Sequence, residues 1–277
     1  MKKICAITMA RNDDFFLTRW IAHYGRELGK ENLYIFLDGE DQPIPKNAEG
    51  VNITHRKRVA EQVVAADKSR VKFLSQVAEE LLQRYDMVIG VDADEFLVVD
   101  PKCGKSLTEY LSSIKCNPCV SGLGLDIGQN MNTEAQLDED LPFMQQRSYA
   151  LLLPRYTKSS VISKPVKWGS GFHRVKGHKF RIDPNLYLFH FGSVDMEMIR
   201  QRFLDKDRMA SGLEKHIKKR ARTIHLITDR NAKIGEKWLK IARRIQRCLR
   251  PVYALNKPSM AGWKLIVKLP DRFKTTC

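Results

Sequence analysis

No stretch of this sequence approaches the about 20 consecutive apolar residues that a membrane-spanning helix requires. The N-terminal segment MKKICAITMARNDD has two lysines before a short apolar run, as a secretion signal has, but no A-x-A-like cleavage site follows. We therefore interpret this segment as the first buried strand and expect a cytoplasmic protein. Internal repeats and low-complexity segments are also absent, which argues against repeat architectures.

Cysteine is too scattered to build a metal or disulfide framework. The six cysteines include one C-x-x-C pair, Cys116 and Cys119, but no second ligand pair follows at the spacing of a zinc site. We expect no zinc or redox role for this pair, and no disulfides in a cytoplasmic protein. A glycine-rich Walker sequence is missing as well. Hydrophobic residues, in contrast, make up 43% of the 277 residues, enough for a sizeable core.

Acidic residues are scarce only in the last part of the chain. Residues 1–199 contain 26 Lys and Arg and 26 Asp and Glu, so they carry no net charge. Residues 200–277 contain 22 basic and 6 acidic residues and carry the whole net charge of +16. We therefore predict a neutral domain over residues 1–199 and a basic, mainly helical C-terminal region over residues 200–277.

The most informative segment is MVIGVDADEFLVV, from Met87 to Val99. Its two apolar runs are typical of strands buried on both faces. Asp92, Asp94 and Glu95 lie between these runs, and three carboxylates within four residues repel one another. In an extended segment Asp92 and Asp94 point to the same side, so one Mg²⁺ or Mn²⁺ ion is the simplest compensation. The alternative is an acidic turn after a buried strand.

Strand and helix signals alternate along the first half of the chain. This pattern predicts an α/β fold with a mostly parallel, twisted sheet and helices on both faces. The expected strands cover residues 2–10, 32–37, 51–54, 87–91, 119–127, 150–153 and 187–191, and the expected helices cover residues 15–28, 60–85, 194–209 and 235–249. Polar residues follow three of the strands: Arg11 and Asn12, Asp38, and the Asp92–Asp94 segment. Because ligands bind beyond the carboxyl ends of strands in such sheets, we expect one site there.

The order of these segments resembles family-2-like glycosyltransferases with a GT-A fold, in particular the branch of bacterial cell-surface glycan enzymes whose acidic motif is D-x-D-E-F. The resemblance covers residues 4–195. It is carried by Arg11-Asn12, WIAHY in the first expected helix, NLYIFLDGEDQ, a long helix with Arg70, Lys72 and Phe73, YDMVIGVDADEFL, SKPVKWGSGFHRV and LYLFHFG. It implies that residues 1–199 form a nucleotide-sugar-binding catalytic domain.

The resemblance further implies transfer of a sugar from a nucleoside-diphosphate sugar to a glycan or lipid-linked acceptor. A Mn²⁺ or Mg²⁺ ion held by Asp92 and Asp94 would neutralise the departing diphosphate. His190 is the candidate that completes the metal site, and a core histidine is the alternative reading. The candidate nucleotide-sugar ligands are Arg11, Asn12, Asp38 and Asp92, with a surface cation and a turn-forming Asp-Gly as the plainer readings of Arg11 and Asp38.

An inverting transfer needs a group that takes the proton of the acceptor hydroxyl. The sequence does not single it out. The candidates are His173, Asp126, Glu95 and Asp195, with His173 and Asp126 first. His173 follows the glycine-rich segment GSGF, where the backbone could approach a ligand closely, and a flexible turn is the alternative. The inverting stereochemistry itself is implied only by the resemblance.

Residues 235–249 (GEKWLKIARRIQRCL) combine an apolar stripe with a basic face. One interpretation is a helix that lies on an anionic membrane surface, which would suit a lipid-linked acceptor and a peripheral location on the inner face of the cell membrane. The other is a helix that packs its stripe on the catalytic domain and exposes its basic face to solvent. The segment WKLIVKL, residues 263–269, could add a second apolar contact.

Two further classes of function fit parts of the sequence. A nucleic-acid-binding protein would use the basic region on phosphates, but the aromatic residues are not interleaved with the basic ones as a stacking surface needs. We therefore expect no nucleic-acid partner. A metal-dependent phosphoryl or nucleotidyl transfer enzyme would also use paired carboxylates.

Overall fold

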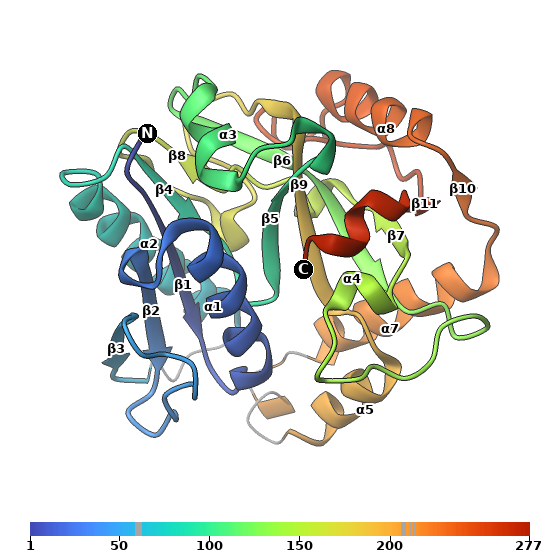
Figure 1. Ribbon diagram of the computed structural model, residues 1–277, viewed down its shortest axis with the longest axis horizontal. Coiled ribbons are helices and arrows are strands. Elements are labelled where there is room, and N and C mark those ends of the chain that lie inside the picture. The colour runs from blue at the N-terminus through green and yellow to red at the C-terminus, as the bar shows by residue number, and fades with distance from the viewer. Residues whose placement is uncertain (59–62, 206–208, 211, 213) are drawn as a thin grey trace.

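The computed structural model describes all residues of the chain except 59–62, 206–208, 211 and 213 (Figure 1). The described residues form an α/β fold around one 11-stranded mixed sheet. Strands β3 (Asn52–Arg56), β2 (Leu33–Asp38), β1 (Ile4–Ala10) and β4 (Met87–Gly90) lie side by side in this order, and all three pairings are parallel. The carboxyl ends of these strands therefore meet at one edge, where the sequence placed its polar residues.

Helices cover both faces of this parallel part. Ile4 and Ala6 of β1 pack in one cluster with Trp20 of α1 (Asp14–Leu28), whereas Cys5 and Ile7 pack in another with residues of α2 (Val63–Leu81). Successive side chains of a strand point to opposite faces, so the two helices lie on opposite sides of the sheet. The predicted α/β class with helices on both faces is confirmed.

The second half of the sheet introduces antiparallel strands. Strand β8 (Val161–Ile162) pairs antiparallel with β4 and with β6 (Cys119–Gly128), which also pairs antiparallel with β7 (Tyr149–Leu152). Strand β9 (Ile182–Ser193) lies between β6, to which it is parallel, and β5 (Glu95–Val99), to which it is antiparallel. In this register His190 lies opposite Glu95 on one side and Asp126 on the other. We call these three residues the cross-strand row.

The basic C-terminal region continues the same fold. It contains α5 (Met196–Leu204), α7 (Glu214–Asp229), β10 (Lys233–Ile234), α8 (Lys237–Cys248) and β11 (Leu265–Lys268), and β11 pairs antiparallel with β7. The apolar segment 263–269 thus contributes a strand to the sheet. Leu239 and Ala242 of α8 are buried in the main core, so this helix packs its apolar stripe inward and exposes a basic face.

Short elements complete the described chain. They are α3 (Leu107–Ser113), α4 (Phe143–Gln146) and the 3₁₀ helices Lys30–Asn32, Pro101–Cys103, Pro154–Tyr156, Ser170–Phe172 and Asp271–Thr275. The first residues of the helix expected over 60–85, and residues 206–208 of the one expected over 194–209, lie outside the described residues. Helix α7, α3 and the pairing of β11 are features that the sequence pattern did not predict. No helix in the described part of the chain has the length and apolar content needed to cross a bilayer.

Candidate active site

The acidic motif lies in a turn that follows the carboxyl end of β4. The backbone N–H of Glu95 donates a hydrogen bond to the carbonyl of Asp92 (3.0 Å), which closes the turn. The segment is therefore a turn and not the extended segment that we expected, whereas its role in metal binding stays a prediction. The reason lies in the sheet: β4 pairs with β1 and β8, whereas β5 joins β9, so the chain must change direction between them.

Asp92 is held by two cations from distant parts of the chain. Arg70 of α2 donates from Nη1 to Asp92 Oδ1 (2.7 Å), and Lys158 donates from Nζ to Asp92 Oδ2 (2.7 Å). Lys158 also forms an ion pair with Glu95 Oε1 (2.6 Å), and its side chain is only 2% exposed. Arg70 makes a further ion pair with Asp67 (2.9 Å). The Asp92 side chain is 28% exposed, so it is the motif carboxylate that a ligand can reach.

Asp94 belongs to a second group of residues, built on the cross-strand row. Arg220 of α7 donates from Nη2 to Asp94 Oδ2 (2.8 Å), and His190 Nε2 lies 3.4 Å from the same oxygen. The other imidazole nitrogen, Nδ1, lies 2.7 Å from Asp126 Oδ1. Thr223 donates to the second oxygen of Asp126 (2.8 Å), so both oxygens of this buried carboxylate have partners.

These contacts determine the charges at the site. Burial alone would raise the pKa of Asp92, but Lys158 and Arg70 outweigh it and lower that pKa. Burial likewise opposes a low pKa at Asp94, where His190 and Arg220 outweigh it. For His190, burial favours the neutral ring, but Asp94 and Asp126 raise its pKa to about 9. The carboxylates of the motif are thus compensated by cations of the protein itself.

Glu95 behaves differently from the two aspartates. Its side chain is fully buried, and burial raises its pKa to about 7, although Lys158 acts in the opposite direction. Its Oε2 accepts only a long hydrogen bond from the backbone of Asp92 (3.4 Å). The charge of Lys158 is therefore shared between one partly exposed carboxylate and one buried carboxylate.

Asp94 and His190 are of the ligand types that divalent cations use, but the raised pKa of His190 leaves its imidazole protonated, so a cation would bind only with loss of that proton. Asp94 Oδ2 and His190 Nε2 converge, and Asp126 holds the second imidazole nitrogen, as an outer carboxylate commonly does for a metal-bound histidine. No group of three His, Cys, Asp or Glu residues in the described ranges is arranged around one point.

The polar residues after β1 and β2 form a network of their own. Arg11 makes two hydrogen bonds to Asp41 (both 2.9 Å) and one to the backbone carbonyl of Asp38 (2.8 Å). Asn12 and Gln42 exchange two hydrogen bonds, of 2.7 and 3.0 Å. Oδ1 of Asp38 is buried and has no hydrogen-bond partner among the described residues. A buried acceptor in this state needs an explanation, and a bound ligand is one.

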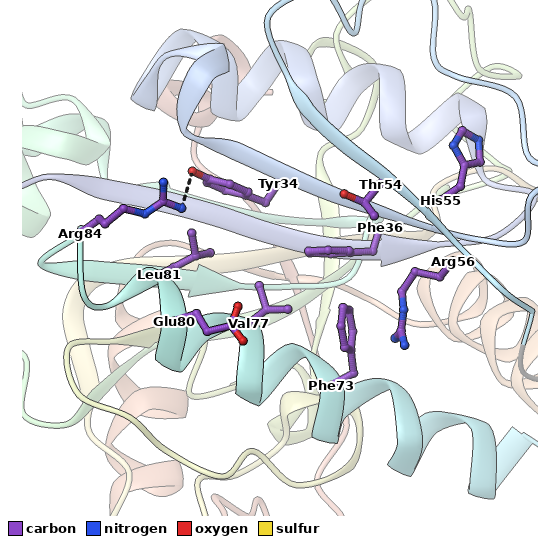
Figure 2. A pocket seen from close by; sticks show the side chains of 10 residues that line it. All are labelled: Tyr34, Phe36, Thr54, His55, Arg56, Phe73, Val77, Glu80, Leu81 and Arg84. Atoms are coloured by element: carbon purple, nitrogen blue, oxygen red, sulfur yellow. Dashed lines mark hydrogen bonds between the residues drawn. The ribbon is translucent and has the colours of Figure 1, made fainter.

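A cavity of about 430 Å³ opens between α2 and the strands β2 and β3 (Figure 2). Phe36 and Phe73 meet edge to face at 4.9 Å, and the guanidinium of Arg56 lies 3.5 Å from the centre of the Phe73 ring. Figure 2 shows these three side chains grouped at one end of the cavity. Phe36, which lines the cavity, and Asp38 lie two residues apart on β2 and therefore share a face of the sheet.

His173 lies at the end of the glycine-rich segment, after the 3₁₀ helix Ser170–Phe172. Its Nδ1 is 2.7 Å from the carbonyl of Arg155. Because a carbonyl only accepts, Nδ1 carries the proton and Nε2 keeps its lone pair. Burial, together with the positive charge of Lys158, lowers the pKa of His173 to about 3, so the ring is neutral. Asp195 is instead buried as the N-cap of α5 and pairs with Arg147 (3.2 Å).

Sequence reasoning missed three residues of this site: Lys158, Arg220 and Gly192. Lys158 and Arg220 lie among many other basic residues, and nothing in their spacing distinguishes them. Gly192 had a usable signal, because it follows His190 in LYLFHFG. A Cβ atom at Gly192 would lie 2.5 Å from His190 Cε1 and 2.6 Å from Arg220 Nε. The glycine therefore makes room for the pairing of Arg220 with Asp94.

No protein-family model matches the sequence, and no curated protein matches it. Among solved structures, the chain is similar to CMP:2-keto-3-deoxy-manno-octonic acid synthetase complexed with CTP (12% identity, TM-score 0.29, 80% of this chain and 87% of that one). It is also similar to mannose-1-phosphate geranyltransferase from Thermus thermophilus (11%, 0.31, 98% and 76%) and to the bifunctional glycosyltransferase WbbM (15%, 0.26, 47% and 24%). Likenesses at this level assign no activity to the chain.

Proposed function

We propose that this protein is a glycosyltransferase of the D-x-D-E-F type, which moves a sugar from a nucleoside-diphosphate sugar to a glycan or lipid-linked acceptor. The observation that carries the proposal is the acidic turn after β4. It presents a partly exposed Asp92 between the buried Lys158 and the partly exposed Arg70, at the sheet edge where an oxygen of Asp38 has no partner among the described residues. Such an edge is where α/β sheets bind nucleotides.

The donor is expected to lie along this edge. Its base would occupy the cavity beside Phe36 and Phe73, where aromatic rings offer a stacking surface. The ribose hydroxyls would donate to the free oxygen of Asp38. Arg70 lies one helical turn before Phe73 on α2 and contacts Asp92. The diphosphate would therefore extend from the base in the cavity toward Arg70 and Lys158.

A divalent cation would draw Asp92, Asp94 and His190 together when the donor binds, because in the described residues these side chains do not yet surround one point. When bound, it supplies a Lewis acid that neutralises the departing diphosphate. Asp126 fixes the imidazole of His190, and Thr223 fixes Asp126, so the ring keeps one orientation. Arg220 holds Asp94 in place and carries one positive charge beside the site.

His173 is the general base that the geometry supports best. Its neutral ring keeps a lone pair on Nε2, whereas both oxygens of Asp126 are engaged and Glu95 is fully buried against Lys158. Asp126 then acts as a positioning residue for His190. The low pKa of His173 makes it a weak base, so it would accept the proton only as the glycosidic bond breaks.

Turnover of nucleotide sugars with Mn²⁺ tests the proposal. A thermal-shift screen of nucleotide sugars first identifies the donor, because a bound ligand stabilises the folded protein by mass action. With that donor, release of the nucleoside diphosphate is measured for Asp92→Ala and Asp94→Ala. We expect a fall of at least about 100-fold in both variants.

The matched control is Asp140→Ala, which removes a carboxylate from an exposed loop and should leave turnover unchanged. Release of pyrophosphate instead of a nucleoside diphosphate would indicate nucleotidyl transfer and contradict the proposal. Full activity in both motif variants, with melting temperatures like the parent's, would do the same.

A further inference from the structure

Exposed apolar side chains gather in one short part of the chain, between α8 and β11. Val252, Tyr253, Leu255 and Trp263 are 105, 76, 82 and 62% exposed, and Leu249 is 40% exposed. We call residues 249–263 the apolar loop. Soluble proteins expose single apolar residues routinely, whereas a group of large ones marks an interaction surface.

The apolar loop is anchored, so its exposed side chains are presented in a fixed way. The N–H of Ser259 donates to the carbonyl of Leu249 (3.1 Å), which brings the two ends of the turn together. Ala254 and Met260 are buried, at 7 and 2% exposure. Tyr253 and Leu255, on either side of Ala254, are in contrast 76 and 82% exposed. The anchored backbone thus presents these two apolar side chains to the outside.

The surroundings of the apolar loop are strongly basic. Residues 237–268 contain nine Lys and Arg and no Asp or Glu. A second cavity, of about 330 Å³, lies beside the loop and is lined by Arg181, Arg247 and Arg250 together with Phe180, Ile182 and Pro184. The three guanidinium groups donate to backbone carbonyls, and none pairs with a carboxylate of the described residues. Their charge is therefore available to an external anion.

The apolar loop also lies next to the candidate active site. The side chain of Asn256 donates to the carbonyl of Val175 (2.8 Å), two residues after His173. The loop is thus hydrogen-bonded to the segment that carries the proposed base, two residues after it. A surface that binds the loop would lie close to the side of the site where the acceptor hydroxyl must arrive.

We propose that the apolar loop and the adjoining arginine cavity dock this protein on an anionic membrane. The apolar side chains would enter the headgroup region, and the cavity would take a lipid phosphate. In this proposal the membrane contact is made by the apolar loop and not by α8, because α8 buries its apolar stripe against the core. The docking stands by itself, whereas its purpose, the delivery of a lipid-linked acceptor to His173, rests on the proposed function. Nucleic acid is the less suitable partner because a phosphate backbone gives Val252 and Leu255 nothing to contact.

Vesicle binding with tryptophan fluorescence tests the docking. Vesicles of phosphatidylcholine with phosphatidylglycerol are compared with pure phosphatidylcholine, and brominated lipid serves as a quencher. Trp20 and Trp168 are buried and Trp238 is half-buried, so quenching reports mainly on Trp263. We expect binding to anionic vesicles only, quenching by brominated lipid, and loss of most quenching in Trp263→Phe.

Two pairs of variants separate charge from apolar insertion. Arg247→Gln with Arg250→Gln should weaken partitioning about thirty-fold, at about 1 kcal/mol for each cation. Its control, Lys46→Gln with Lys105→Gln, removes the same charge from exposed positions elsewhere and should change partitioning far less. Leu255→Ser with Trp263→Ser should also weaken binding, whereas Leu141→Ser with Leu204→Ser, taken from other exposed positions, should not.

Three results would overturn the docking. They are no binding to anionic vesicles, binding without quenching of Trp263, or equal binding by the apolar-loop variants and their controls. Binding of a DNA or RNA oligonucleotide that depends on Arg247 and Arg250, without vesicle binding, would assign the surface to nucleic acid. The docking variants should keep release of the nucleoside diphosphate with a soluble acceptor. If vesicle binding holds but Asp92→Ala keeps full activity, the proposed function fails and the docking remains.

Discussion

At the scale of single residues, the notable feature is that one buried lysine serves two carboxylates. Lys158 lies 2.7 Å from Asp92 and 2.6 Å from Glu95, with its side chain 2% exposed. Charges removed from water in this way are costly unless each has a partner. The lysine therefore matters to the stability of the fold as much as to the chemistry of the site.

Lys158→Met should destabilise the protein by about 3–5 kcal/mol, because Asp92 and Glu95 would lose their shared cation in a largely buried place. Urea unfolding at pH 7 measures the change. Lys164→Met, at an exposed position of the same segment, is the control and should stay within about 0.5 kcal/mol of the parent. Equal stability of the two variants would show that Lys158 does not carry the charge of these carboxylates.

The sequence revealed the acidic partners of this site but not the basic ones. Three carboxylates in four residues are rare enough to attract attention, whereas Lys158 and Arg220 are two of 48 Lys and Arg residues. Only the folded chain shows that these two lie against Asp92 and Asp94. The sequence indicates that the negative charge of these carboxylates needs positive charge nearby. Part of that positive charge comes from Lys158 and Arg220, which residue spacing could not reveal.

At the scale of elements, one ion pair joins the residue after β5 to the C-terminal 3₁₀ helix Asp271–Thr275. Its contribution can be tested through the pH dependence of stability. Arg272 donates to both oxygens of Asp100, at 2.7 and 2.9 Å. Burial acts to raise the pKa of Asp100, but the hydrogen bonds from Arg272 and from the backbone of Lys102 outweigh it and lower that pKa. A carboxyl with a lowered pKa stabilises the fold above its ordinary pKa and loses this contribution as the pH falls through the lowered value.

Asp100→Asn should therefore cost about 2 kcal/mol at pH 7 and progressively less as the pH falls below the ordinary aspartate pKa of about 3.9, toward the lowered pKa of Asp100 in the folded parent. Urea unfolding of parent and variant at a series of pH values gives the difference directly. Asp140→Asn, in an exposed loop, should show a small difference at every pH. A cost that did not shrink at low pH would argue against the charge of Asp100 as its origin.

The sequence predicts an element best where the hydrophobic period and the length of the segment indicate the same type of element. Strands β1, β2, β3, β4 and β6 and helices α1 and α8 lie within a few residues of the expected ranges. Helix α7 was not predicted, because its many basic residues obscure the apolar period of the buried positions Ile217, Ile224 and Ile227. The turn at Asp92–Glu95 stayed only an alternative, because its cause, the pairing of β5 with β9, is a long-range contact that local pattern cannot show.

At the scale of the whole molecule, the neutral and basic parts of the chain do not have separate hydrophobic cores. Leu239, Val267 and Phe273 of the basic region are buried in the same cluster as Ile4 and Ala6 of the first strand. The division into a catalytic domain over 1–199 and a basic region over 200–277 stays a prediction about function. For folding, the shared core and the pairing of β11 with β7 favour one cooperative unit.

We expect one calorimetric unfolding transition whose calorimetric and van't Hoff enthalpies agree, as they do for a two-state protein. The physical reason is that no element of residues 237–273 can leave without opening the main core. Differential scanning calorimetry at pH 7 measures both enthalpies. Two separated transitions, or a van't Hoff enthalpy well below the calorimetric one, would show that the basic region unfolds by itself.

The cross-strand row has a consequence for how this protein can change over time. Glu95, His190 and Asp126 come from three strands that are distant in sequence, and they meet because Tyr187–His190 of β9 keeps a continuous register with both β5 and β6. Losing or gaining a single residue within the continuously paired stretch 187–190 would turn the imidazole of His190 to the opposite face of the sheet. Point substitutions can therefore adjust this centre gradually, whereas length changes in that strand would abolish it at once. We expect the number of residues in this strand to vary less than the side chains it carries.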